Sequence, residues 1–224
     1  MQKTSRLETE SPRIRLVTLD WSGTVSDDRN PVWMANMAVL RDHQKPVLSF
    51  EEWLPNTFIN PMEFYRSRGI SGSDDELFRK YKRAYDSIEG NAPKAYADAK
   101  EVLKFMAEFV PLIVISSHPE DHLLKEASGY GMSNHIKEFK GGVRNKAATI
   151  AGVCANFKIK PQNAIYVGDM TFDILAGKEA GVWSVAITTG YHQEDKLSTA
   201  EPDLLVNSLA ELGGRLLPLL RKQA

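Results

Sequence analysis

The stretch "RIRLVTLDWSGTVSD", residues 13–27, begins with an apolar run that ends abruptly at Asp20. A short apolar run rich in Leu and β-branched residues is typical of a strand buried on both faces. After Asp20, Gly23 and Thr24 suit a tight turn whose backbone N–H groups could face an anion. The stretch therefore predicts a strand with a carboxylate at its carboxyl end. It also raises the question of why Ser22, and not a second acid, lies two residues after Asp20.

The rest of the chain repeats the strand pattern and alternates it with helical patterns. Further apolar, β-branched runs lie at 111–117, 163–169, 182–188 and 203–207. Helical patterns lie at about 119–129, 145–157, 172–180 and 207–221. Alternating strands and helices predict an α/β fold, a Rossmann-like parallel sheet with helices on both faces. Ligands of such sheets bind at the carboxyl ends of the strands.

One segment, residues 29–108, breaks this alternation. It contains helical patterns at 31–43, 50–58 and 74–88 but no convincing strand. We expect it to form a small all-helical domain inserted after the first strand. Residues 13–28 and 109–224 would then form the α/β core, and the polar residues 1–12 a flexible tail.

Composition narrows the class of protein. With 42% hydrophobic residues, 224 residues suffice for one sizeable core. Lys and Arg (28) balance Asp and Glu (29), which gives no support for nucleic-acid binding. The apolar runs fall far short of the ~20 residues that cross a bilayer, and the N-terminus lacks the apolar centre of a secretory signal. The single Cys154 excludes an internal disulfide. We expect a cytoplasmic protein that binds neither membrane nor nucleic acid.

A second acidic cluster follows the run at 163–169, in "VGDMTFD". Asp169 ends the predicted strand, and Asp173 falls in the first turn of the next helix. Asp173 could simply favour the helix N-terminus, where negative charge is stabilising. However, these two carboxylates and Asp20 would repel one another unless a cation lay between them. Such an oxygen-rich cluster suits Mg²⁺.

Two further features stand at strand ends or helix starts. Ser116 and Ser117 follow the run at 111–117 and precede Pro119, so an anion could bind free N–H groups there, although ordinary helix capping also explains the serines. Lys146 opens a helix directly after Asn145, where a cation opposes the helix dipole. Its side chain must either reach solvent or face the acids. The histidines show no metal-ligand spacing, so a zinc site is not expected.

Taken together, "DWSGTVSD", "VISSHP", Lys146 and "VGDMTFD" resemble, in order and spacing, the four motifs of the haloacid dehalogenase-like hydrolases. The resemblance covers the chain from about residue 13 onward. It implies that 29–108 is the helical cap domain that one large subgroup carries after the first motif. It also implies a Mg²⁺-dependent hydrolase of the phosphoric monoester class, acting on a small phosphorylated metabolite.

The resemblance implies a role for each matching residue that handles phosphate. Asp20 matches the nucleophile, which attacks phosphorus and forms an aspartyl-phosphate. Ser116 matches the hydroxyl that binds the transferring phosphoryl group, with help from the backbone N–H of Ser117. Lys146 matches the lysine that neutralises charge on the nucleophile and the phosphate. Phosphoryl transfer needs such positioning and charge neutralisation above all.

The resemblance likewise implies a metal site, with one departure from the family pattern. Mg²⁺ would lie between the carboxylates of Asp20 and Asp169 and the backbone carbonyl of Ser22, with Asp173 as the supporting acid. Phosphatases of the family usually carry Asp at the position of Ser22, where it acts as acid and base. A serine hydroxyl is no acid near neutral pH, and losing such a group forfeits on the order of 10² to 10⁴ in rate. We therefore expect a substrate with an easy leaving group, or slow chemistry.

Two other interpretations of Ser22 remain open. "DWSGT" is close to the "DWAGT" of phosphonoacetaldehyde hydrolases, which use a cap lysine to form a Schiff base; Lys45, Lys80, Lys82 and Lys94 are available, but none lies in a recognisable copy of that cap motif. Alternatively, the chain is a degenerate homologue that binds a phosphorylated ligand or partner without turnover. The retained motif residues favour an enzyme. The sequence predicts no oligomeric state.

Overall fold

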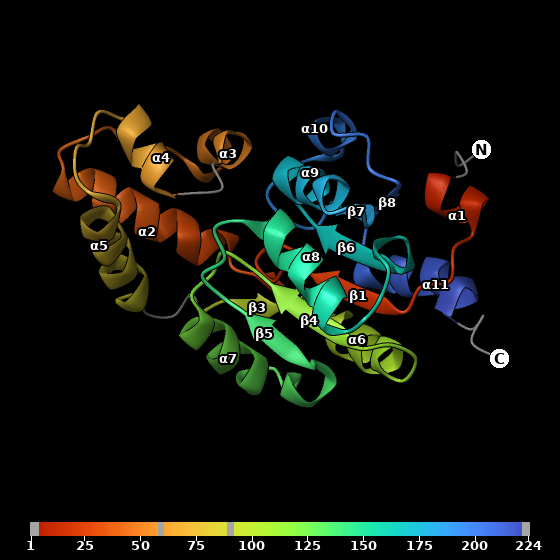
Figure 1. Ribbon diagram of the computed structural model, residues 1–224. Helices are drawn as coiled ribbons and strands as arrows, with labels where there is room; N and C mark the ends of the chain where they lie inside the picture. The colour runs from red at the N-terminus through yellow and green to blue at the C-terminus, as the bar shows by residue number, and fades with distance from the viewer. Residues whose placement is uncertain (1–4, 58–60, 89–91, 221–224) are drawn as a thin grey trace. The chain divides into compact units, whose positions relative to one another are not determined.

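The computed structural model describes residues 5–57, 61–88 and 92–220 of the chain. Its centre is a six-stranded sheet in the order β5-β4-β1-β6-β7-β8 (Figure 1). The strands are β1 (Leu16–Leu19), β4 (Leu112–Ile115), β5 (Glu138–Lys140), β6 (Ala164–Gly168), β7 (Trp183–Ile187) and β8 (Leu204–Val206). All five neighbouring pairs are parallel. The predicted Rossmann-like α/β fold is therefore confirmed.

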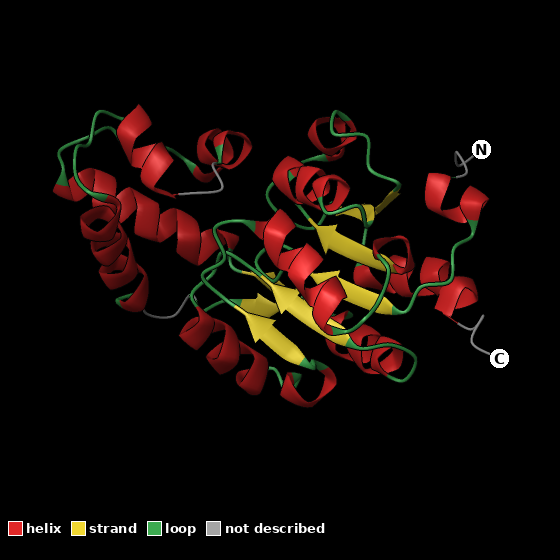
Figure 2. Cartoon of the chain, in the orientation of Figure 1, coloured by secondary structure: helices red, strands yellow, loops and turns green. Residues whose placement is uncertain are grey.

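Helices cover both faces of this sheet, as Figure 2 shows for the strands in yellow and the helices in red. On one face, α6 (Ala99–Ala107), α7 (Glu120–Gly129) and α11 (Leu209–Leu220) bury apolar side chains against alternate strand residues. On the other face, α8 (Lys146–Asn156) and α9 (Thr171–Glu179) do the same, and α10 (Glu194–Ser198) packs beside α9. Burial on both sides explains why the inner strands read as continuous apolar runs.

The chain divides into two compact units, Met1–Asp27 with Ala95–Ala224 and Asp28–Lys94. The described residues of the second unit are helical or in loops, except that β3 (Lys94–Ala95) begins at its last residue, Lys94. Its helices are α2 (Arg29–Asp42), α3 (Phe50–Trp53), the 3₁₀ turn η1 (Leu54–Asn56), α4 (Pro61–Ser67) and α5 (Asp74–Asp86). The insert was predicted to run to residue 108, but α6 lies in the first unit because Leu103 and Met106 are buried in the core of the sheet.

The short strands β2 (Ser26–Asp27) and β3 (Lys94–Ala95) pair in a second, two-stranded sheet. No sequence pattern indicates this pair, because each strand has only two residues. The remaining 3₁₀ turns are η2 (Ser133–His135) and η3 (Pro161–Asn163).

The prediction of a flexible tail over 1–12 is wrong for the described part of that segment, which begins at residue 5. There α1 (Arg6–Glu10) starts with a capping box, in which the Ser5 side chain accepts from the Glu8 N–H and Glu8 accepts from the Ser5 N–H. Leu7 is fully buried in the main core, and Arg6 lies over the ring of Trp183. One buried leucine and a good cap hold this helix in place. Residues 1–4 lie outside the described residues.

The edge strand β5 and helix α4 were also missed. The three β5 residues are all half-buried, as expected at a sheet edge, so they present no apolar run.

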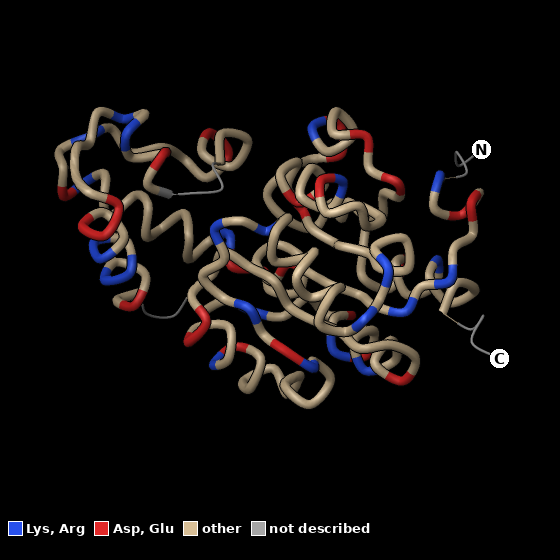
Figure 3. Tube along the Cα trace, viewed as in Figure 1, with Lys and Arg blue, Asp and Glu red and all other residues tan. Residues whose placement is uncertain are grey.

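Charge is spread over the trace without a long basic segment (Figure 3). Among the residues that the structure describes, no helix combines the length and apolarity needed to cross a bilayer.

Candidate functional site

Asp20 is the first residue after β1, and its carboxylate is fixed in place by the backbone around it. Its backbone N–H continues the sheet by donating to the carbonyl of Val167 at 2.8 Å. The backbone N–H of Trp21 donates to Asp20 Oδ1 at 2.7 Å. The chain then turns tightly, with Gly23 at a φ of 72°. Asp20 is 5% exposed, so it is a buried carboxylate at the carboxyl end of a central strand.

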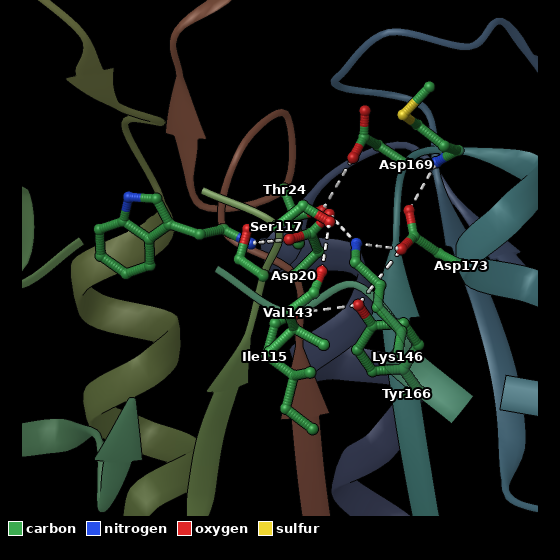
Figure 4. Close-up of polar contacts among 12 residues, drawn as sticks. Asp20, Thr24, Ile115, Ser117, Val143, Lys146, Tyr166, Asp169 and Asp173 are labelled. Carbon is green, nitrogen blue, oxygen red and sulfur yellow. Dashed lines mark hydrogen bonds and ion pairs between the residues drawn. The ribbon is translucent and has the colours of Figure 1, made fainter. Parts of the chain in front are cut away.

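Lys146, the first residue of α8, turns its side chain toward the acids and not toward solvent (Figure 4). Its Nζ lies 2.7 Å from Asp20 Oδ2 and 2.6 Å from Asp173 Oδ1. Burial alone would lower the pKa of Lys146, but the carboxylates of Asp173 and Asp20 raise it well above its ordinary value. The side chain is therefore an ammonium ion that bridges two carboxylates, and these carboxylates offset its unfavourable place at a helix N-terminus.

Asp169 and Asp173 occupy the start of the turn after β6 and the first turn of α9. Asp169 accepts from the backbone N–H of Tyr191 at 2.7 Å and from the Thr24 hydroxyl at 3.4 Å. Asp173 accepts from the backbone N–H of Met170 at 3.0 Å. Burial and the neighbouring carboxylates raise the pKa of Asp169 well above its usual range. Burial also raises the pKa of Asp173, against the opposing effect of Lys146.

The three carboxylates of Asp20, Asp169 and Asp173 each offer an oxygen within 4.8 Å of the others. Lys146 contacts two of them, so its single positive charge is set against three buried acids. The backbone closes tightly around Asp169, because a Cβ at Gly23 or Gly190 would collide with its carboxylate. Hard oxygen donors gathered in this way, with excess negative charge, fit a divalent cation such as Mg²⁺.

Ser116 and Ser117 follow β4, the neighbour of β1 in the sheet. Ser116 is buried, and its hydroxyl oxygen accepts from the backbone N–H of His118 at 3.3 Å. Ser117 is exposed, and its hydroxyl donates to the carbonyl of Val143 at 2.9 Å (Figure 4). Because parallel neighbours end at the same edge, the serine pair and Asp20 leave the sheet on the same side.

Tyr166, in the middle of β6, was not singled out from the sequence. Its hydroxyl lies 3.2 Å from Asp173 Oδ1 and 3.0 Å from the carbonyl oxygen of Ile115, so it can donate a hydrogen bond to the Asp173 carboxylate. The only signal in the sequence is a tyrosine within an otherwise aliphatic run. A buried hydroxyl needs a partner, and here one partner is a site carboxylate.

Residues 19–187, which include every side chain of the candidate site, match the family described as haloacid dehalogenase-like hydrolase. The match covers well over half of the chain. The chain belongs to the haloacid dehalogenase-like hydrolases. The expectation of a hydrolase of this superfamily is thereby confirmed.

The individual relatives of this haloacid dehalogenase-like hydrolase share less than 30% of its sequence. A phosphoglycolate phosphatase of Haemophilus influenzae is 28% identical over 129 residues, which span 54% of this chain and 57% of that protein. A phosphoglycolate phosphatase of Vibrio vulnificus is 26% identical over 220 residues, 89% of this chain and 94% of that protein. A crystal structure titled as a predicted phosphatase from Clostridium acetobutylicum superposes with a TM-score of 0.80 at 18% identity, over 91% of this chain and 98% of that one. The likeness of "DWSGT" to phosphonoacetaldehyde hydrolases stays a prediction.

The structure of this hydrolase brings four of the predicted site residues into direct or near contact: Asp20, Lys146, Asp169 and Asp173. Ser22 lies half-buried in the turn after Asp20, and its backbone forms an isolated β-bridge with Ser26. Its side chain carries no carboxyl group, so the departure from the family pattern stands in three dimensions as it does in sequence.

Proposed function

We propose that this chain is a Mg²⁺-dependent phosphatase that hydrolyses a small phosphorylated metabolite by way of an aspartyl-phosphate on Asp20. The observation that carries the proposal is the ammonium group of Lys146, which bridges Asp20 and Asp173 beside the third buried acid, Asp169. A carboxylate held by a cation and a backbone N–H is positioned to attack an electrophile. The relatives named phosphoglycolate phosphatase support the coarser statement, a phosphatase of small phosphorylated metabolites.

The first displacement forms a bond between a carboxylate oxygen of Asp20 and phosphorus and breaks the bond from phosphorus to the leaving oxygen. Because Trp21 N–H fixes one carboxylate oxygen and Lys146 contacts the other, the nucleophile needs little reorganisation. Ser116 and the N–H groups near Ser117 would hold the phosphoryl oxygens. In the second displacement, water attacks phosphorus and the bond to Asp20 breaks, which restores the carboxylate and releases phosphate.

The donor set also supports a cation in the site. Asp20, Asp169 and the backbone carbonyl of Ser22 would hold Mg²⁺, with Asp173 as the supporting acid. When bound, the ion supplies positive charge to phosphoryl oxygens and to the buried acids. The chain's own Lys146 contributes a further positive charge beside Asp20, and its raised pKa keeps it protonated through the neutral range.

Ser22 limits which leaving groups the chain can handle. A hydroxyl cannot deliver a proton to a departing alkoxide near neutral pH. Acyl and aryl phosphates expel stable anions, so they need no such proton. We therefore infer fast turnover of acyl and aryl phosphates and slow turnover of alkyl phosphates.

A substrate panel tests the proposal. It contains acetyl phosphate, para-nitrophenyl phosphate, 2-phosphoglycolate and phosphonoacetaldehyde, each assayed with MgCl₂ and with EDTA. Asp20→Asn should abolish the Mg²⁺-dependent activity. If this variant still hydrolyses the substrates, Asp20 is not the nucleophile. A rate that does not depend on the leaving group would refute the inference from Ser22.

The same panel separates the alternatives. Borohydride trapping of the chain with phosphonoacetaldehyde would reveal a Schiff base on a lysine. Alanine variants of Lys45, Lys80, Lys82 and Lys94 would then show which lysine is trapped. If no compound is turned over while phosphate raises the melting temperature, the chain is a binding protein.

A further inference from the structure

Glu126, in the middle of α7, is a nearly buried carboxylate that contacts the turn after Asp20. Its side chain is 11% exposed. Its Oε2 accepts from the indole Nε1–H of Trp21 and from the Ser26 hydroxyl, both at 2.8 Å. These two donors stand at the beginning and near the end of the turn that follows the nucleophile. One carboxylate therefore holds both ends of that turn.

The other oxygen of Glu126 reaches the turn after β4. His118 Nε2 lies 3.3 Å from Glu126 Oε1, and the backbone N–H of His118 donates to the Ser116 hydroxyl oxygen. His118 directly follows Ser117 in the sequence. Glu126 thus contacts, through single side chains, both the nucleophile turn and the phosphate-binding turn of the proposed site.

Aromatic packing makes this connection stiff. The ring of Trp21 stacks on Tyr130 with centroids 6.0 Å apart and an interplanar angle of 10°, and meets Phe139 edge-on at 6.2 Å. The Tyr130 hydroxyl lies 2.9 Å from Ser26 Oγ and 3.4 Å from Glu126 Oε2. A packed ring with a satisfied N–H has little freedom to rotate.

Trp21 transmits this order to the nucleophile. Its indole N–H donates to Glu126, and its backbone N–H donates to Asp20 Oδ1 at 2.7 Å. If the indole loses its acceptor, a buried N–H is left unsatisfied and the residue must shift to find another partner. The backbone N–H that fixes the Asp20 carboxylate would move with it.

We propose that Glu126 is a positioning residue, which ties the Asp20 turn to the Ser116 turn and so orients the Asp20 carboxylate for attack on phosphorus. The inference rests on the proposed phosphatase function. Glu126 touches none of the proposed reacting atoms; it acts through Trp21 and His118. A misplacement of a nucleophile by about 1 Å can lower a rate by roughly 10²-fold, so the effect of removing this acceptor should appear in kcat.

The first arm of the test compares two substitutions at this position with para-nitrophenyl phosphate and MgCl₂. Glu126→Leu removes every acceptor, so kcat should fall by about 10- to 100-fold while KM stays within about threefold. Glu126→Gln keeps an acceptor oxygen for Trp21 and Ser26, so most of the activity should return. Glu101→Gln, at an exposed glutamate of α6, is the matched control and should leave both constants unchanged.

Trp21→Phe is the second arm, because it keeps an aromatic ring at this position and deletes the indole N–H donor, together with the volume of the second ring. It should lower kcat in the same direction, and the double variant with Glu126→Leu should lose no more than the worse single variant. Melting temperatures are measured for all variants. If Glu126→Leu lowers the melting temperature but leaves the kcat of the folded protein intact, the residue is only structural and the proposal is wrong.

A third readout does not depend on turnover. Amide hydrogen exchange at residue 21, followed by NMR, should be at least about tenfold faster in Glu126→Leu and Trp21→Phe and unchanged in Glu101→Gln. Unchanged exchange in Glu126→Leu would overturn the positioning role even if the chain is an active phosphatase. Conversely, faster exchange in a chain that hydrolyses nothing in the panel would locate the failure in the proposed function.

Discussion

Replacing Asp169 with Asn should make the protein more stable when divalent cations are absent. Asp169 is fully buried, and its carboxylate shares the site with two other acids and one lysine. Asn has nearly the same shape; its amide oxygen can accept from Tyr191 N–H, and its amide nitrogen can donate to the Thr24 hydroxyl. The substitution therefore removes repulsion and desolvation of a charge without leaving an obvious unpaired group.

The direction follows from the raised pKa of Asp169. An acid whose pKa is higher in the folded than in the unfolded state destabilises the fold once the pH exceeds the unfolded-state pKa, and the penalty is complete above the folded-state pKa. The penalty is about 1.4 kcal/mol for each pH unit that separates the two pKa values, and it disappears as the pH falls. Burial and the two neighbouring carboxylates both act in this direction. We expect Asp169→Asn to unfold at a higher temperature than the wild type at pH 7.5 in EDTA, by roughly 2 to 4 °C for each kcal/mol of relieved repulsion and desolvation in a domain of this size.

Mg²⁺ should reverse the order of the two proteins. A cation bound only to the folded state adds about 2.7 kcal/mol at a hundred times its dissociation constant. The wild type should therefore gain stability on titration with MgCl₂, whereas Asp169→Asn, which lacks one carboxylate, should gain little. Thermal melts in EDTA and over a MgCl₂ series measure both effects.

Asp203→Asn is the matched control, because Asp203 is also buried but accepts from Ser184 and pairs with Arg6. This variant should lose stability and keep the full response to Mg²⁺. If Asp169→Asn proves less stable than the wild type in EDTA and Mg²⁺ raises both proteins equally, the acidic cluster is not a cation site.

Three further changes have defined outcomes. Ser22→Asp should raise the hydrolysis of alkyl phosphates by about 10- to 100-fold in steady-state assays if a missing acid is what limits the rate, and no gain would show that Ser22 is not the defect. Although burial raises the pKa of Glu126, its hydrogen bonds with His118, Trp21 and Ser26 lower the net value below 4.5, so its stabilising contribution is present above that pH. The difference in unfolding free energy between the wild type and Glu126→Gln should therefore shrink as the pH falls below 4.5, and a difference that grows would contradict this assignment of sign. Leu7→Ala should cost about 2 to 5 kcal/mol in denaturant unfolding, whereas a cost near zero would mean that α1 does not hold the core.

The inner part of the fold could be predicted from sequence because its strands are buried on both faces. Leu16–Leu19 and Ala164–Gly168 are buried throughout, and each is followed by an acid where the buried strand ends. Glu138–Lys140 escaped prediction because an edge strand is half-buried and its residues alternate with charge. The helix at Arg6–Glu10 escaped because its contribution to the core is a single leucine.

The candidate site divides in the same way. Asp20, Asp169 and Lys146 stand at strand ends or a helix start, where sequence position alone implies a common edge of the sheet. Glu126 lies mid-helix, where a glutamate ordinarily faces solvent, and its partners Trp21 and Ser26 are about a hundred residues away. Such a contact arises from tertiary packing, which a local pattern does not encode.

The pairing of β2 with β3 has a consequence for how this protein can change over time. The chain leaves the α/β unit through Ser26–Asp27 and returns through Lys94–Ala95, and these two strands lie side by side. The inserted segment therefore begins and ends at two strands that are neighbours in one small sheet. We expect exchange of residues 28–93 by recombination or laboratory grafting to preserve the register of the six-stranded sheet, because none of its strands lies within that segment. The residues that make the proposed chemistry and the residues of the insert can therefore be inherited separately.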